Sequence, residues 1–297
     1  METDRSQPEP ISLRIMLRLF LVPLAVVLVC VGVFLLFGLI AGDRKTGQDY
    51  VNEIRSGTEI RRWQAAFELA TYVRSKSPER LREENLVQQF IHLFEEAETT
   101  DPRIRRYLAL TLGRLQDPRA VGTLVKALEE TDDQTVIYAA WALGNIGAIE
   151  ASPHLARLLG NVDSGIRKMA AYSLGALDHP DNVPALRKVL SDPEVDVTWN
   201  AALALGRLHD PTARTLLEQM TRRSYLVQFP EVSPAGRDQI VINAVRSLAH
   251  LGDPSTRPRL ESISREDPST KVRAAALAAL DQMPESQTDT EMVLPSP

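Results

Sequence analysis

The sequence has 297 residues, a formal net charge of −5 at pH 7, 44% hydrophobic residues and one cysteine, Cys30. An acidic chain argues against a nucleic-acid partner, because phosphate contacts need clustered Lys and Arg. A single cysteine excludes an internal disulfide, and its place in an apolar run excludes a cysteine nucleophile.

The N-terminal region is predicted to anchor the chain in a membrane. Residues 1–18 form a polar tail, and residues 19–41 carry no charge. As a helix, this run is long enough to cross a bilayer core of about 30 Å. The competing interpretation is a cleavable signal peptide, whose apolar region is usually shorter; no clear cleavage site follows. We therefore expect a single-pass membrane protein with the lipid bilayer as the partner of residues 19–41.

The orientation of this predicted span is left open. Arg14 and Arg18 precede it, and Arg44 and Lys45 follow it, so the positive-inside rule favours neither direction. Gly38 and the glycine four residues later form a small-residue pair of the kind found in helix dimers. A homodimer through this helix is one interpretation, and chance occurrence in a glycine-containing apolar segment is the other.

Residues 42–58 are interpreted as a short connection, and residues 59–283 as a repeat array. A six-residue frame, Ala-Ala-x-x-Leu-Gly, begins at Ala139, Ala170 and Ala201, at steps of 31 residues. Looser copies extend the series in both directions. The anchor leucines are Leu69, Leu112, Leu143, Leu174, Leu205, Leu248 and Leu280. Self-similarity at such a period is typical of a solenoid.

Each repeat is predicted to contain two helices. The first carries the frame, and the second shows apolar residues three and four apart, such as Leu155, Leu158 and Leu159. Asp-Pro dipeptides such as Asp117-Pro118 separate the helices, because aspartate caps a helix start and proline suits its first position. The frame glycines serve close packing or loosen the helix end, and sequence alone does not decide which.

These residues resemble the short HEAT-like repeats named after phycobilisome lyases. The shared pattern is an apolar residue and an arginine before the frame, as in Ile104-Arg105, Ile166-Arg167 and Val272-Arg273. The resemblance covers about residues 59–283. It implies an all-α, armadillo-type α-solenoid of about seven HEAT-like helix pairs, here preceded by the predicted transmembrane helix. It says little about function. Residues 284–297 have no core-forming pattern and are expected to be disordered.

Two steps between anchor leucines are 43 residues instead of 31, namely Leu69 to Leu112 and Leu205 to Leu248. The first extra length falls in 75–96, where apolar residues predict a longer second helix that caps the array. The second falls at 222–230 and continues through Gly236. An insertion in one repeat forms a loop at one edge, often the binding edge.

The sequence offers no enzyme motif. The resemblance extends to deoxyhypusine hydroxylase, a HEAT-like di-iron enzyme whose ligands are His-Glu dipeptides, but none of the five histidines here is followed by Glu. Nothing marks a tetrapyrrole site of the bilin lyase type. We therefore expect no catalytic residue, metal or cofactor, and a non-catalytic, membrane-anchored scaffold that binds a partner protein. The alternative is a HEAT-like oxidoreductase or lyase-type enzyme.

Two sets of residues are candidate partner-binding sites. In the insertion, four large apolar side chains either pack onto the array or form an exposed patch beside two arginines: Tyr225, Leu226, Val227, Phe229, Arg222 and Arg223. The second set lies on the second helices and is expected to face the inner, concave side, where it suits an acidic or extended peptide or remains solvated: Lys126, Arg157, Arg187, Lys188 and Arg214. Trp63, Trp141 and Trp199 occupy different frame positions and are interpreted as packing residues.

Overall fold

The computed structural model describes residues 13–40, 45–75, 86–97 and 101–283, with side chains of the first helix given for 21–34. The chain divides into two units, 1–46 and 47–297. Residues 1–12 of the predicted polar tail 1–18 and the predicted tail 284–297 lie outside the described residues, whereas 13–18 belong to the first helix. So does the second glycine of the proposed dimer pair, and the side-chain environment of Gly38 is not described.

The first unit contains one helix, α1 (Leu13–Ile40). In the portion described, no helix has the length and apolar character needed to cross a membrane. The predicted span at 19–41, the lipid partner and the single-pass membrane localisation are corrected accordingly.

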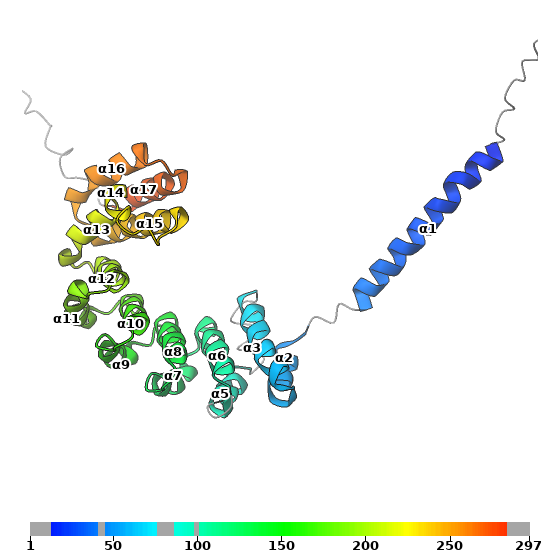
Figure 1. Cartoon of the computed structure of the whole chain (residues 1–297), viewed down its shortest axis with the longest axis horizontal. Coiled ribbons are helices and arrows are strands. Elements are labelled where there is room, and N and C mark those ends of the chain that lie inside the picture. The colour runs from blue at the N-terminus through cyan, green and yellow to red at the C-terminus, as the bar shows by residue number, and fades with distance from the viewer. Residues whose placement is uncertain (1–12, 41–44, 76–85, 98–100, 284–297) are drawn as a thin grey trace, which may run out of the picture. The chain divides into compact units, whose positions relative to one another are not determined.

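The second unit is an α-solenoid (Figure 1). Seven of its helices carry the sequence frame, and we call these the frame helices: α3 (Glu59–Arg74), α6 (Pro102–Leu115), α8 (Asp133–Ile146), α10 (Ser164–Ala176), α12 (Val195–Arg207), α15 (Pro234–Leu251) and α17 (Thr270–Gln282). Each follows one of the short helices: α2 (Gly47–Ser56), α5 (Leu86–Glu96), α7 (Val121–Ala127), α9 (Ser152–Leu158), α11 (Val183–Lys188), α13 (Arg214–Met220) and α16 (Arg257–Glu266).

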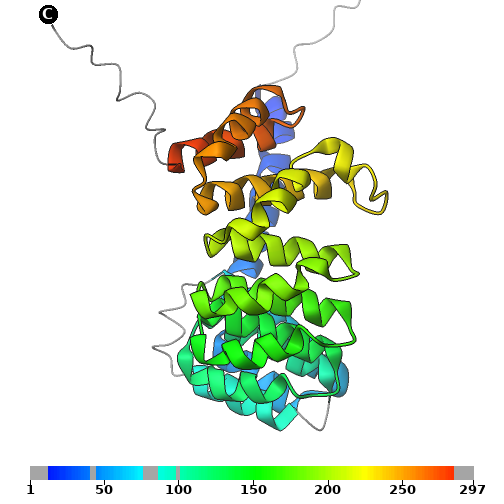
Figure 2. The ribbon, with the colours of Figure 1, turned by 90° about the vertical axis from the view of Figure 1, so that its left-hand side faces the viewer.

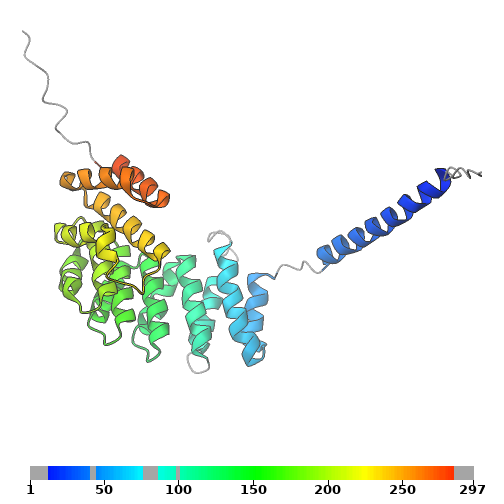
Figure 3. The ribbon, with the colours of Figure 1, turned by 45° about the horizontal axis from the view of Figure 1, so that its top comes forward.

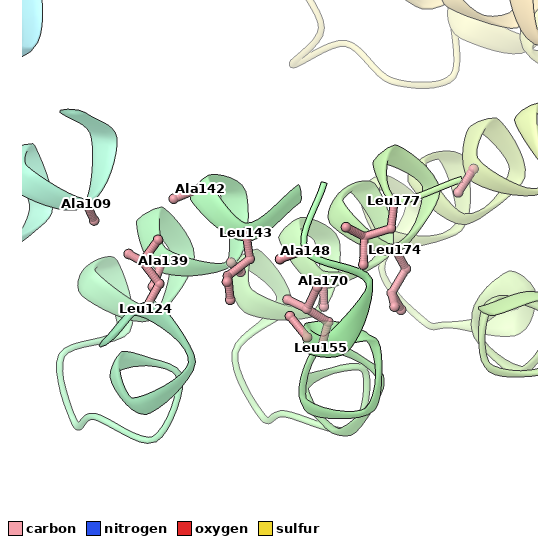
Figure 4. Close-up of a cluster of buried hydrophobic side chains, with 14 of the residues drawn as sticks. Ala109, Leu124, Ala139, Ala142, Leu143, Ala148, Leu155, Ala170, Leu174 and Leu177 are labelled. Carbon is pink, nitrogen blue, oxygen red and sulfur yellow. The ribbon is translucent and has the colours of Figure 1, made fainter. Parts of the chain in front are cut away.

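The helix pairs are offset by half a repeat from the predicted pairs. Each short helix packs on the frame helix that follows it, as α7 does on α8 and α9 on α10. Figure 4 shows Leu124 of α7 beside Ala139 of α8, and Leu155 of α9 beside Ala170 of α10. The first pair is therefore α2 with α3, and the predicted connection 42–58 contains a helix of the array.

Buried leucines and alanines form the core between these helices. The anchor leucines from Leu69 to Leu248 are fully buried, and so are the first alanines of the central frames. The predicted apolar second helix in 75–96 is α5, which buries Phe90 and Phe94 completely. Figure 2 shows the resulting stack of helical layers.

The frame glycines serve close packing. A Cβ at Gly113 would lie 2.7 Å from Cα of Ala142, and one at Gly175 would lie 2.7 Å from Cα of Ala204. Gly144 faces Ser173 in the same way, at 3.0 Å. Each glycine therefore meets the fourth frame position of the next repeat, and any side chain there would separate neighbouring frame helices.

Close approach on one side gives the array its curvature. Successive frame helices pack extensively on one another, whereas consecutive short helices do so much less. Figure 1 shows α6, α8, α10 and α12 on the inner side of the resulting arc, and α7, α9 and α11 on the outer side. The candidate cations on the short helices therefore lie on the outer side, which differs from the sequence-based expectation.

The Asp-Pro turns behave as predicted. Asp117, Asp210 and Asp253 each accept a hydrogen bond from the backbone N–H two residues later and precede a 3-10 turn that begins with the proline. These turns are η2 (Pro118–Ala120), η6 (Pro211–Ala213) and η7 (Pro254–Thr256). The buried carboxylates also accept from arginines, as Asp210 does from Arg187. One short polar motif thus ends one helix and begins the next.

An ion pair joins α6 to the cap of α8. The Arg106 guanidinium donates to Asp132, with 2.9 Å between Nε and Oδ2. Asp132 also accepts from the backbone N–H and the hydroxyl of Thr135, so it caps α8. The hydrogen bond from Arg106 is the main reason that the pKa of Asp132 falls to about 2. A lowered carboxyl pKa means that the native state holds the charged form more strongly than the unfolded chain does.

We expect Arg106→Gln to lower the free energy of unfolding at pH 7 by about 1–2 kcal/mol. The stabilisation that Arg106 provides is fully present above the pKa of Asp132 in the unfolded chain, near 3.9. It is lost as the pH falls through the pKa of Asp132 in the folded protein, about 2. Urea unfolding from pH 7 downward should show parent and variant converging in acid. The control is Arg61→Gln, which breaks an exposed pair with Glu53 at 3.7 Å and should cost less than about 0.5 kcal/mol. A pH-independent difference would contradict this prediction.

Candidate partner-binding surface

The predicted insertion folds against the array. It contains α14 (Arg223–Leu226), whose Leu226 is fully buried. The phenol oxygen of Tyr225 accepts a hydrogen bond from Nε1 of Trp199 at 3.2 Å. The rings of Trp199 and Phe229 meet edge to face at 5.0 Å between centroids. Of the four apolar residues, only Val227 is largely exposed, at 63%.

The two arginines of the insertion differ. Arg223 pairs with Asp238 of α15 at 2.7 Å and with Asp267, before α17, at 2.8 Å. It therefore ties the insertion to the last two frame helices. Arg222 is exposed. A binding role for this segment stays a prediction, with Val227 and Arg222 as its accessible side chains.

The cations of the short helices are partly engaged in holding the array together. Arg187 pairs with Asp210, and Arg214 pairs with Asp253 at 2.9 Å, so each bonds to the cap of a later turn. Arg157 lies 3.6 Å from Glu129 with both side chains exposed, a geometry that contributes little. Lys126 of α7 and Lys188 of α11 are exposed, and both helices lie on the outer side of the arc. Their binding role stays a prediction.

The inner side of the frame helices carries a feature that sequence reasoning missed. On each frame helix, the residue before the frame and the third residue of the frame lie on one stripe, since they are three apart. The neighbouring frame helices and the short helix cover the other sides. On this stripe lie five partly or largely exposed aromatic residues, which we call the aromatic row: Phe67, Tyr107, Tyr138, Trp141 and Tyr172.

The aromatic row runs over four consecutive frame helices, from α3 to α10. Phe67 and Tyr107 meet edge to face at 5.3 Å between ring centroids, so they join α3 to α6. Trp141 reaches back over α6, where its ring edge would lie 2.8 Å from a Cβ at Gly113. Rings held in this way present apolar faces while losing little conformational freedom.

The stripe changes character at α12 and α15. There a pocket of about 270 Å³ is lined by Tyr172, Asn200, Leu203, Ala204, Arg207, Asn243, Arg246, Ser247 and His250. Figures 1 and 3 show α15 running obliquely to α8 and α10. The pocket lies between α12 and α15, where the step between anchor leucines is 43 residues instead of 31.

The turn histidines have local contacts of their own. In the described part of the chain, no three His, Cys, Asp or Glu side chains are grouped as metal ligands would be. His154 contacts Arg157 through Nδ1 at 2.7 Å, and His179 lies 3.8 Å from Asp181, so these turn histidines have local neighbours. The inner stripe instead provides apolar rings followed by hydrogen-bond donors.

Comparison with known proteins shows a similarity to HEAT repeats in the central part of the array. A family model described as HEAT repeats matches residues 91–175 and 157–227, so the central part of the array is similar to HEAT repeats. No curated protein matches the chain.

Among solved structures, the complex of CpcE and CpcF of phycocyanin lyase from Nostoc sp. PCC7120 is similar in fold. It has a TM-score of 0.59 and 22% identity, covering 84% of this chain and 92% of that one. A designed armadillo repeat protein in complex with the peptide (KR)4 has a TM-score of 0.44 and 17% identity, covering 80% and 99%. Human deoxyhypusine hydroxylase has a TM-score of 0.37 and 18% identity, covering 83% and 98%. The likeness to the CpcE–CpcF complex shows a shared repeat fold and nothing finer.

Proposed function

We propose that the repeat array is a non-catalytic scaffold that binds a partner protein along the inner stripe of its frame helices. The observation that carries the proposal is the aromatic row, whose five rings stay partly or largely exposed and lie on one stripe over four successive frame helices. Aromatic side chains dominate binding energy in protein interfaces. Their alignment over successive repeats favours an extended partner segment over a compact one.

The second candidate function, a lyase-type enzyme, has no support beyond likeness of fold. The similarity to the CpcE–CpcF complex is at 22% identity, and we take only the repeat architecture from it. No observation at the level of residues favours that reaction here.

Site-specific photocrosslinking tests the scaffold proposal. A photoreactive phenylalanine analogue placed at Tyr138 or Tyr172 should capture a protein in native cells, and the same analogue at Lys126 on the outer side should not. Trp141→Ala should then reduce capture at Tyr172 at least about tenfold, because loss of an interface aromatic costs about 2 kcal/mol or more. Capture from Lys126 alone would place binding on the other side of the array.

A further inference from the structure

The pocket between α12 and α15 differs in charge from the chain around it. The protein carries a net charge of −5, yet the described residues that line this pocket include two arginines, a histidine and two asparagines, and no acid. We call the set Arg207, Arg246, His250, Asn200 and Asn243 the basic pocket.

The arginines of the basic pocket are not used by the fold. Most described arginines donate to a carboxylate or a carbonyl, as Arg105, Arg167 and Arg259 do. Within the described ranges, Arg207 and Arg246 make no ion pair and no side-chain hydrogen bond, and both are exposed. Asp196, one turn before Asn200 on α12, pairs with Lys168 at 3.1 Å. Two guanidinium groups in one pocket are therefore available to an anion.

The asparagines add donors beside the arginines. The side-chain oxygen of Asn243 accepts a hydrogen bond from the side-chain amide of Gln239 at 2.8 Å. The NH2 group of Asn243 is therefore left to donate to a ligand. The amide of Asn200 donates to the backbone oxygen of Asp196 at 2.7 Å, which fixes its orientation and leaves its side-chain oxygen as an acceptor. An extended peptide needs such donors and acceptors for its own backbone groups.

The longer repeat step explains why the pocket exists. Asn200 and Asn243, Leu203 and Arg246, and Arg207 and His250 occupy equivalent positions in two adjacent repeats. Between these repeats α12 packs less extensively on α15 than it does on α10. The insertion, held by Arg223 and by the Trp199 cluster, lets α15 turn away and opens the space that closer frame helices would fill.

We propose that the basic pocket binds the carboxylates of an acidic, extended segment of the partner protein, whose apolar part lies along the aromatic row. This inference rests on the proposed function. Charge-assisted hydrogen bonds from guanidinium to carboxylate are stronger than neutral ones and give a planar, two-point contact. The change from rings to arginines along one stripe gives the segment a direction.

Three fluorescein-labelled peptides test this with the full chain. Each has eight alternating serine and leucine residues followed by three glutamates, three glutamines or three lysines, and each is also made in reversed order. Fluorescence anisotropy shows which of the two residue orders of the glutamate peptide binds more tightly. In that order, the glutamate peptide should bind at least about tenfold more tightly than the glutamine peptide. Arg207→Gln with Arg246→Gln should abolish that difference and leave glutamine-probe binding unchanged.

Arg265→Gln is the matched control, because Arg265 is an exposed arginine of α16 outside the pocket, and it should retain the preference. Equal binding of glutamate and glutamine probes, both weakened by Trp141→Ala, would overturn the pocket inference and leave the scaffold proposal standing. Absence of glutamate-probe binding at about 1 mM would overturn the inference as well. A phosphoserine probe that binds through the same arginines more tightly than the glutamate probe would assign the pocket to phosphate instead of carboxylate.

Discussion

Leu174→Ala is expected to lower the free energy of unfolding by about 2–5 kcal/mol. Leu174 is fully buried between the frame helices and the short helices, so truncation leaves a cavity that rigid neighbours cannot fill. Urea denaturation measures the loss. Leu277→Ala is the control, since Leu277 is 54% exposed on the last frame helix and its truncation should cost little.

The position of the damage is a second readout for Leu174→Ala. In a linear array each repeat contacts only its neighbours, so amide exchange should accelerate chiefly in α8, α10 and α12. Acceleration restricted to α2, α3 and α17 would contradict the assigned packing.

Gly175→Val is expected to destabilise the array by about 3 kcal/mol. A Cβ at Gly175 would overlap Cβ of Ala204 and lie 2.7 Å from its Cα, and backbone cannot move aside as a flexible side chain can. The thermal midpoint should fall, and the contact between α10 and α12 should open.

Gly122→Val is the matched control for the glycine substitution. Gly122 lies in α7, and a Cβ added there would meet nothing within 4 Å, so valine should leave stability nearly unchanged. Equal losses at the two sites would mean that helix propensity, and not the approach of neighbouring frame helices, sets the cost.

Much of the fold could be predicted from the sequence, because the same local physics recurs in each repeat. The period of the anchor leucines indicated the frame helices, and Asp117-Pro118 and its relatives indicated the turns. The pairing of helices could not be predicted, since a short helix between two frame helices is equally close in sequence to both. Contacts such as that of Leu124 with Ala139 decide it.

The aromatic row could have been predicted from the sequence by comparing aromatic residues of all kinds at equivalent frame positions. Trp141 and Tyr172 share the third frame position, and Tyr107 and Tyr138 share the position before the frame. Comparing only tryptophans with one another hid this alignment, because Trp63 and Trp199 occupy another position. The side of the array that a helix lines depends on curvature, and curvature depends on how closely Gly113 and its counterparts approach their neighbours. The closeness of this approach is known only from the packed structure.

The looser packing between α12 and α15 also bears on cooperativity. In a one-dimensional array, the free energy of coupling between neighbours decides whether repeats unfold together or separately. Packing is most extensive from α6 to α12 and less extensive between α12 and α15, so we expect the coupling to be weaker there. The chain from 234 onward packs on α12 and α13 and is tied to the insertion by the ion pairs of Arg223. It can lose order as a subunit of its own, so a single transition temperature would not describe the whole array.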